Sequence, residues 1–173
     1  MKETEIKILE INRKEIEKKL IDIGAKKVFE GDMTATFWDF KDNSLKKSKQ
    51  IFRLRKEGEK TTLTFKKPVQ DSSAKVSQEF EVKVSDFSKM LMILEALGFI
   101  NILIMKKHRI SYKFENINFE IDNYVDDFDF VPEFLEIESD NFDSIINILE
   151  KIGYSKDDYV KFSATELINH YRK

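Results

Sequence analysis

Three short segments of this chain carry a carboxylate at every second position, and this alternation constrains the fold more than any other feature. The segments are Glu3–Ile8, Glu79–Val84 and Glu136–Glu138. Alternate residues of a β-strand point to the same side of a sheet, so the acids of each segment share one face. The opposite face is expected to pack against a core and holds Thr4, Ile6, Phe80, Val82, Leu135 and Ile137.

Four helices are predicted from capping residues and from apolar residues at helical spacing. They are expected to run from Asn12 to Gly24, from Ser85 to Gly98, from Asp140 or Asn141 to Gly153, and from Ser163 to Lys173. A glycine ends each of the first three helices, because glycine adopts the left-handed conformation that closes many helices without steric strain. The buried stripe of the second helix is expected to comprise Phe87, Met90, Leu91, Leu94 and Leu97.

Eight strands are predicted around these helices. Besides the first strand, Glu3–Ile8, they are Phe29–Phe40, Gln50–Arg55, Thr61–Lys66, Ser77–Val84, Lys106–Phe114, Ile117–Tyr124 and Phe134–Glu138. Hairpin turns are expected at residues 57–60 and 115–116, and loops at 43–49 and 69–75. Adjacent hairpins favour an antiparallel sheet, and eight antiparallel strands can close into a barrel that admits one small ligand. The prediction is a single α+β domain over residues 1–173.

Composition excludes several classes of protein. The net charge is −2 although 36% of residues are charged, which argues against nucleic acid or membranes as partners. The chain has no cysteine, so thiolate metal sites and disulfides are absent. Met90–Met105 is the most apolar stretch and is too short to span a bilayer. With no apolar signal core at the N-terminus, we expect a cytoplasmic protein, either a monomer or a homodimer.

The polar faces of the predicted strands carry a dense mixture of charges. Parity within each strand places the following on them: Glu3, Glu5, Lys7, Arg53, Arg55, Lys66, Glu79, Glu81, Lys83, Lys107, Arg109, Glu120, Asp122, Glu136 and Glu138. One interpretation is the wet face of an open sheet, with cross-strand pairs worth about 0.2–1 kcal/mol each. For all strands together we favour an enclosed, charged interior, because a wet face more often carries Thr, Ser, Gln and Lys.

A metal-bound triphosphate would neutralise both kinds of charge in such an interior. Carboxylate oxygens suit Mg²⁺ or Mn²⁺, and arginine forks bind phosphate oxygens in pairs. Isolated buried charges are costly, so neither set is expected to be enclosed without the other or without a ligand.

The same residues give the chain a resemblance to the CYTH superfamily, which contains class IV adenylate cyclases, thiamine triphosphatases and inorganic triphosphatases (triphosphate tunnel metalloenzymes). Glu3-x-Glu5-x-Lys7 resembles its ExExK signature. The remaining elements follow in order over almost the whole chain: Arg53-x-Arg55, Lys66, Glu79-x-Glu81, Lys107-x-Arg109, Asp122 and Glu136-x-Glu138. The resemblance implies an eight-stranded antiparallel tunnel that binds a triphosphate with Mg²⁺ or Mn²⁺.

The resemblance also implies roles for these residues. The substrate would be inorganic triphosphate, ATP or thiamine triphosphate, gripped by Arg53, Arg55, Lys66, Lys107 and Arg109, with Lys83 counted among the same cations. The metal ligands would be Glu5, Asp122, Glu136 and Glu138, assisted by Glu3, Glu79 and Glu81. Lys7 would lie beside the attacked phosphate, either as a base with a lowered pKa or as a charged group that stabilises the transition state.

One departure leaves the reaction open. Several hydrolases of the family carry a tyrosine on the second strand, paired with the ExExK lysine, whereas Glu30–Phe40 contains Phe37 and Trp38 but no tyrosine. Tyr124 is a possible substitute without geometric support from the sequence. Triphosphate hydrolysis and cyclisation of ATP remain nearly equal alternatives, and a non-catalytic nucleotide or polyphosphate sensor and a purely structural scaffold are the rival hypotheses.

Overall fold

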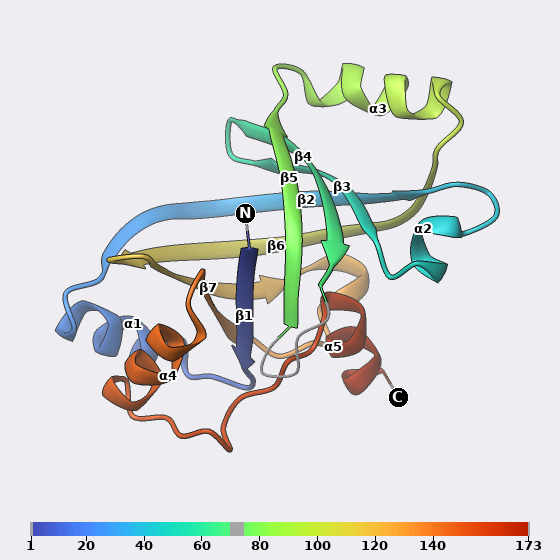
Figure 1. Ribbon diagram of the computed structural model, residues 1–173. Helices are drawn as coiled ribbons and strands as arrows, with labels where there is room; N and C mark the ends of the chain where they lie inside the picture. Colours follow the sequence, from blue (N-terminus) through green and yellow to red (C-terminus); the bar gives the residue numbers. More distant parts are fainter. Residues whose placement is uncertain (1, 70–74, 173) are drawn as a thin grey trace.

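The computed structural model describes residues 2–69 and 75–172, with only the backbone described for Lys2, Glu3, Lys75 and Val76 (Figure 1). The strands are β1 (Lys2–Ile8), β2 (Lys26–Asp39), β3 (Ile51–Glu57), β4 (Lys60–Pro68), β5 (Lys75–Lys83), β6 (Ile100–Phe114), β7 (Ile117–Tyr124) and β8 (Phe134–Ser139). The helices are α1 (Arg13–Asp22), α2 (Ser44–Lys47), α3 (Phe87–Ala96), α4 (Phe142–Lys151) and α5 (Ala164–Tyr171), with a 3₁₀ turn η1 (Asp126–Phe128).

The eight strands form one closed antiparallel barrel in the order β1-β5-β4-β3-β2-β6-β7-β8. Strand β1 closes it by pairing with β5 on one side and β8 on the other. Gly58 makes the tight turn between β3 and β4 with φ of +56°, a conformation that favours glycine. The predicted fold class, an α+β barrel with helices on its outside, is confirmed. None of the described helices is long and apolar enough to cross a membrane.

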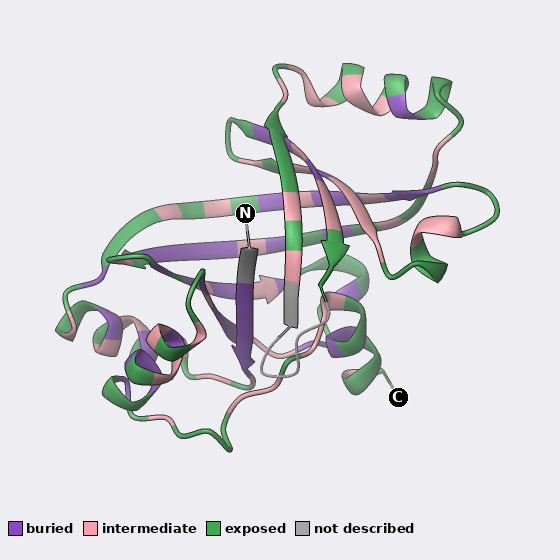
Figure 2. Cartoon of the chain, in the orientation of Figure 1, coloured by how far each residue is buried: buried purple, intermediate pink, exposed green. Residues whose placement is uncertain are grey.

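The larger apolar core lies outside the barrel, where α1 and α4 cover one side of it (Figures 1 and 2). These two helices contribute Ile16, Leu20, Ile145, Ile148 and Leu149. The strands contribute Ile6, Ile8, Ile110, Tyr112, Phe119, Ile121, Leu135 and Ile137. Burying each large side chain stabilises the fold by about 1.5–3 kcal/mol, so these strands are held from outside while their other face is left for charge.

Helix α3 covers a second, smaller part of the outer surface and leaves several predicted core residues exposed. Trp38, Leu54 and Leu94 form the buried centre of this cluster. The expectation that Phe80 and Val82 pack into a core is wrong, because their side chains are 55% and 58% exposed. Leu97 is 66% exposed as well. Period-two and helical spacing give the outward face of an element, but they do not tell how far a short helix extends over that face.

Strand boundaries differ most for β2 and β6. These strands pair from Lys26 with Lys113 to Asp39 with Ile100. The first six residues of β6 lie in the apolar stretch that was not predicted as strand, and their pairing with β2 is a tertiary effect. The predicted loop at 43–49 contains the short helix α2. Most of the predicted loop at 69–75 lies outside the described residues.

The chain after β2 is organised by a buried carboxylate. Asp39 has no exposed surface and accepts hydrogen bonds from the backbone N–H groups of Phe40 (2.7 Å), Leu45 (3.0 Å) and Lys46 (2.9 Å). Burial alone would raise the pKa of Asp39, but the backbone donors outweigh it and hold the pKa below its ordinary value. This single side chain therefore fixes the path of the chain into α2.

We expect Asp39→Asn to lower the free energy of unfolding by about 2 kcal/mol at pH 7, because hydrogen bonds to a charged group are worth about 1.5–3 kcal/mol. Since folding lowers the pKa of Asp39, the stabilisation is fully present above about pH 4 and is lost as pH falls through the folded pKa. Urea unfolding of both proteins at pH 7 and below pH 4 should give a difference that narrows in acid.

Asp42→Asn is the matched control, because Asp42 is exposed and caps only the N–H of Ser44 at 3.0 Å. It should change stability by less than about 0.5 kcal/mol. Equal losses for the two variants, or a difference independent of pH, would contradict this account of Asp39.

Candidate functional site: a charged cavity inside the barrel

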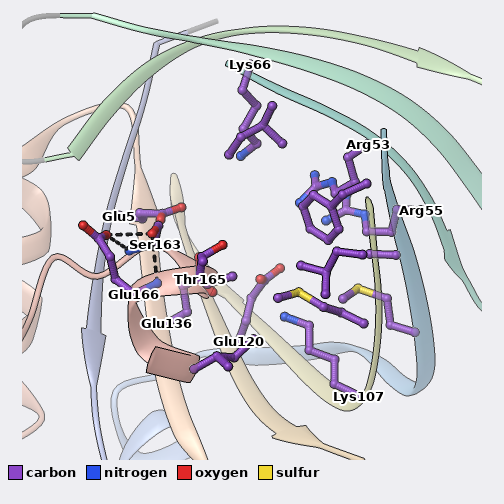
Figure 3. A pocket seen from close by; sticks show the side chains of 18 of the residues that line it. Glu5, Arg53, Arg55, Lys66, Lys107, Glu120, Glu136, Ser163, Thr165 and Glu166 are labelled. Atoms are coloured by element: carbon purple, nitrogen blue, oxygen red, sulfur yellow. Dashed lines mark hydrogen bonds between the residues drawn. The ribbon is translucent and has the colours of Figure 1, made fainter. Parts of the chain in front are cut away.

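The barrel encloses a cavity of about 1710 Å³ that opens to solvent. Twelve of the fifteen charged residues expected from sequence line it: Glu5, Lys7, Arg53, Arg55, Lys66, Glu79, Glu81, Lys107, Arg109, Glu120, Glu136 and Glu138. Figure 3 shows several of these side chains converging on the cavity from different strands. The predicted inner face is therefore one common space.

Three predicted site residues lie elsewhere or are not described. The side chain of Lys83 is exposed and does not line the cavity. Asp122 has no exposed surface and does not line the cavity, but it contacts Lys107 and Arg109, which do. The side chain of Glu3 is outside the described part of the chain. Of the acids proposed as metal ligands, Glu5, Glu79, Glu81, Glu136 and Glu138 thus line the cavity.

Charge is divided around the barrel by strand order. Strands β7, β8, β1 and β5 are neighbours and carry the inner carboxylates, whereas β4, β3 and β6 carry most of the inner cations. In Figure 3 Glu5 and Glu136 lie on one side, and Arg53 and Arg55 on the other. Between β3 and β6, strand β2 contributes the uncharged residues Met33, Ala35 and Phe37. The cavity therefore has an acidic half and a cationic half.

Lys7 is the exception, a cation held within the acidic half. Its ammonium nitrogen lies 3.2 Å from Glu5 Oε1 and 3.2 Å from Glu136 Oε1, and only 3% of the residue is exposed. Burial by itself lowers the pKa of Lys7, but the negative charges of Glu136 and Glu5 prevail and raise it. The raised pKa favours the charged form of Lys7 over the alternative role as a base, which needs a lowered pKa.

A second buried cluster orders the cationic half. Arg109 grips Asp122 with two bonds, Nε to Oδ1 at 2.7 Å and Nη2 to Oδ2 at 2.8 Å, and it also pairs with Glu120. Lys107 pairs with Asp122 as well. Burial works to raise the pKa of Asp122, but the charges of Arg109 and Lys107 lower it overall. Asp122 therefore acts in this structure as the fixed counter-ion that positions two cations.

Arg53 has no such counter-ion. Its Nε is buried and has no hydrogen-bond partner, and among the described residues no carboxylate forms an ion pair with it. Burial and the positive charges of Arg55 and Arg109 lower the pKa of Arg53, and the negative charges of Glu79 and Glu138 offset this only in part. Arginine nevertheless stays charged in proteins. A half-buried guanidinium beside other cations, with an unpaired N–H, is suited to bind a further anion.

The acidic half can hold a divalent cation. Glu5, Glu136 and Glu138 each offer a carboxylate oxygen, and these oxygens lie within 4.8 Å of one another. Glu120, Asp122 and Glu136 form a second group of this kind, but both oxygens of Asp122 are already bonded to Arg109. Hard carboxylate oxygens suit Mg²⁺ or Mn²⁺. The first group therefore fits such an ion better than the second.

The geometry agrees with the comparison with known families. The CYTH domain matches residues 1–163. The chain belongs to the CYTH family. A curated relative from Methanocaldococcus jannaschii, provisionally named an adenylate cyclase, is 30% identical over 179 residues, covering 96% of this chain and 98% of the relative.

Solved structures share the CYTH fold seen here. A Pyrococcus horikoshii protein has a TM-score of 0.79 at 24% identity and covers 96% of this chain and 99% of its own. A provisionally named adenylate cyclase from Vibrio parahaemolyticus has a TM-score of 0.78 at 17% identity, with coverages of 96% and 97%. A Hippeastrum protein, described as a candidate adenylyl cyclase with dominant triphosphatase activity, reaches 0.69 at 14%, with coverages of 99% and 96%. These similarities support the fold.

The C-terminal segment supplies cavity residues that sequence reasoning did not assign. Ser163, Thr165 and Glu166 face the cavity near Glu5 and Glu136 (Figure 3). Ser163 and Glu166 form the predicted capping box of α5. Backbone hydrogen bonds between Lys7 and Val160, at 2.9 and 2.8 Å, fasten this segment to β1. The sequence predicted the helix from its cap, but contact between α5 and the barrel interior depends on long-range packing.

The contrast between Arg109 and Arg53 gives a stability test. We expect Arg109→Met to lower the free energy of unfolding by about 3 kcal/mol, because it strips buried Asp122 and Glu120 of their partner. Arg53→Met should instead raise it by roughly 1 kcal/mol, since a half-buried cation that lies beside other cations and has an unpaired Nε is replaced by an apolar chain of similar length.

Denaturant unfolding in a buffer free of phosphate measures both variants. Equal destabilisation by the two substitutions would show that neighbouring groups compensate the charge of Arg53 in the folded protein. That result would contradict the contrast drawn here between Arg53 and Arg109.

Proposed function

We propose that this CYTH protein is a divalent-metal-dependent enzyme that cleaves triphosphates inside its charged barrel. The observation that carries the proposal is Arg53, a half-buried cation whose Nε has no hydrogen-bond partner, placed beside Arg55 and across the cavity from a group of carboxylates. A triphosphate would supply the missing negative charge. A divalent cation between the acids and the phosphates would allow one ligand to satisfy both halves.

Glu5, Glu136 and Glu138 are the proposed ligands of Mg²⁺ or Mn²⁺, because their carboxylate oxygens already converge. Such an ion polarises phosphoryl oxygens and lowers the pKa of bound water. Glu79 and Glu81 lie on the next strand, where they pair with Lys66 and, at 3.8 Å, with Arg55. We assign these two acids to the orientation of the neighbouring cations.

The cationic half would hold the phosphate chain. Arg53 and Arg55 present forked guanidinium groups that match phosphate oxygens, while Lys107 and Arg109 are fixed in place by Asp122. Lys7 would remain an ammonium and stabilise charge that develops on the attacked phosphoryl group, because Glu5 and Glu136 raise its pKa. Lys83 is exposed and is left with, at most, a role in attracting anions from solution.

Hydrolysis of the terminal phosphate is the first candidate reaction. It would require only the acidic and cationic halves of the cavity, which would bind the triphosphate, and a water molecule. Water can enter because the cavity is open to solvent. Cyclisation of ATP to cyclic AMP and pyrophosphate is the second candidate, because the relative that is 30% identical bears an adenylate cyclase name. Both reactions break a P–O–P linkage and would use the same cations, so their products must be measured separately.

The test incubates the pure protein with inorganic triphosphate, ATP or thiamine triphosphate in Mg²⁺ or Mn²⁺, and quantifies phosphate, pyrophosphate and cyclic AMP. We expect metal-dependent turnover that is abolished by chelator and reduced on the order of 100-fold or more by Glu138→Gln or Glu5→Gln, through loss of a metal ligand. Arg53→Met and Arg55→Ala should raise KM by about 10-fold, since each removes a charged hydrogen-bonding group.

One control variant and two further outcomes separate a metal-dependent enzyme from a sensor and from a metal-independent enzyme. Lys83→Met should retain wild-type kinetics, because Lys83 does not line the cavity. Tight binding of triphosphate without any product would identify a sensor, and full turnover in chelator would disprove the metal assignment.

A further inference from the structure

Strand β2 contains no tyrosine, in contrast to the several family hydrolases described above. The inner face of β2 presents Met33, Ala35 and Phe37 to the cavity, and none of these can donate a hydrogen bond from its side chain. Among the five tyrosines of the chain, Tyr124 at the end of β7 follows Glu120 and Asp122 on the inner parity and lines the cavity. The barrel interior therefore does hold a phenol, but on a different strand.

The ring of Tyr124 is held firmly. Its centroid lies 5.7 Å from that of Phe134 and 6.1 Å from that of Phe128, and the residue is only 4% exposed. Leu167 and Ile168 of α5 pack in the same apolar cluster. Side chains fixed in this way lose little further freedom when they contact a ligand.

The hydroxyl of Tyr124 lacks a strong partner. Among the described residues its one hydrogen-bond contact is with Met105 Sδ at 4.0 Å, and a thioether is a weak acceptor. Most buried hydroxyl groups are paired, and an unpaired one is unfavourable. The hydroxyl of Tyr112 illustrates the usual case, because it donates to Glu17 Oε1 at 2.8 Å. The Tyr124 hydroxyl is thus a donor in need of an acceptor.

The surroundings of Tyr124 point to a phosphate oxygen as that acceptor. Tyr124 is the cross-strand partner of Lys107, whose ammonium lies 5.7 Å from the ring centroid. Burial and the negative charges of Asp122 and Glu136 raise the pKa of Tyr124, and the positive charges of Lys7 and Arg109 offset this only in part. Tyr124 therefore lies among the groups proposed above to hold the metal and the phosphates. With an ordinary pKa near 10, a phenol is protonated at neutral pH and donates.

We propose that Tyr124 is a catalytic residue that donates a hydrogen bond from its hydroxyl to a non-bridging oxygen of the phosphoryl group held by Lys107 and Arg109. The inference rests on the proposed function. The bond forms in the substrate complex and strengthens as negative charge grows on that oxygen in the transition state. No proton is transferred, so the same contact serves hydrolysis and cyclisation.

The test compares Tyr124→Phe with wild type by steady-state kinetics, with saturating Mg²⁺ or Mn²⁺ and inorganic triphosphate or ATP. We expect kcat to fall on the order of 100-fold, as when one transition-state donor is removed. The Kd for a non-hydrolysable imidotriphosphate, measured by calorimetry with Mg²⁺, should rise about 5-fold. The melting temperature should not fall, because the substitution removes only the weak contact with Met105.

Tyr112→Phe is the matched control. Tyr112 is buried to a similar degree and also borders the cavity, but its hydroxyl already donates to Glu17 of α1 on the outside of the barrel, so the substitution should lower the melting temperature and leave kcat unchanged.

A kcat for Tyr124→Phe within about 2-fold of wild type would overturn the proposal while leaving triphosphate cleavage intact. If wild type binds imidotriphosphate but releases no product, the proposed reaction fails, and an unchanged Kd in Tyr124→Phe would then overturn the contact as well. If wild type neither binds nor turns over any triphosphate, both proposals fall.

Discussion

Mutual neutralisation of opposite charges across an enclosed space is the constraint on which this structure depends. Carboxylates and cations that would each be intolerable alone are brought together because closure of the sheet places acidic and basic strands on facing arcs. Asp122 shows the principle at its strongest, since it has no exposed surface and is held by Arg109 and Lys107. At Arg53 the balance of charge is incomplete, since its buried Nε has no hydrogen-bond partner.

The apolar packing that stabilises the barrel is displaced to its outer surface. Helices α1 and α4 bury the outward residues of β1, β6, β7 and β8, so four of the strands that carry inward charged groups are packed against helices on their outer face. A conventional barrel interior filled with aliphatic side chains would be more stable but would leave no cavity. The outward faces of the strands thus serve apolar packing and the inward faces carry charged groups. The stability of the fold therefore does not require the inner face to be apolar.

Sequence reasoning was most successful where the physical rule is local. The alternation around Glu5, Arg53 and Arg109 predicted which side chains share the interior, because side-chain direction in a strand depends only on parity. The glycine that ends α1 and the cap of α5 were likewise read from neighbouring residues. Failures arose where distant parts of the chain decide the outcome: the exposure of Phe80 depends on the reach of α3, and the strand at Ile100 exists because β2 pairs with it. Lys83 shares the parity of Glu79 and Glu81 but lies beyond the cavity, since parity gives a direction and no depth.

The C-terminal helix α5 differs from the strands that form the rest of the cavity wall. The match to the CYTH domain stops at residue 163, and α5 begins at Ala164, yet Thr165, Ile168 and Asn169 of this helix line the cavity. The charged residues predicted from sequence line the cavity from strands, which are hydrogen-bonded to neighbouring strands. By contrast, α5 pairs with no strand and packs on the barrel through side chains such as Leu167 and Ile168. Substitutions on the cavity side of α5 can therefore alter what the cavity admits while the charged faces of the strands stay the same.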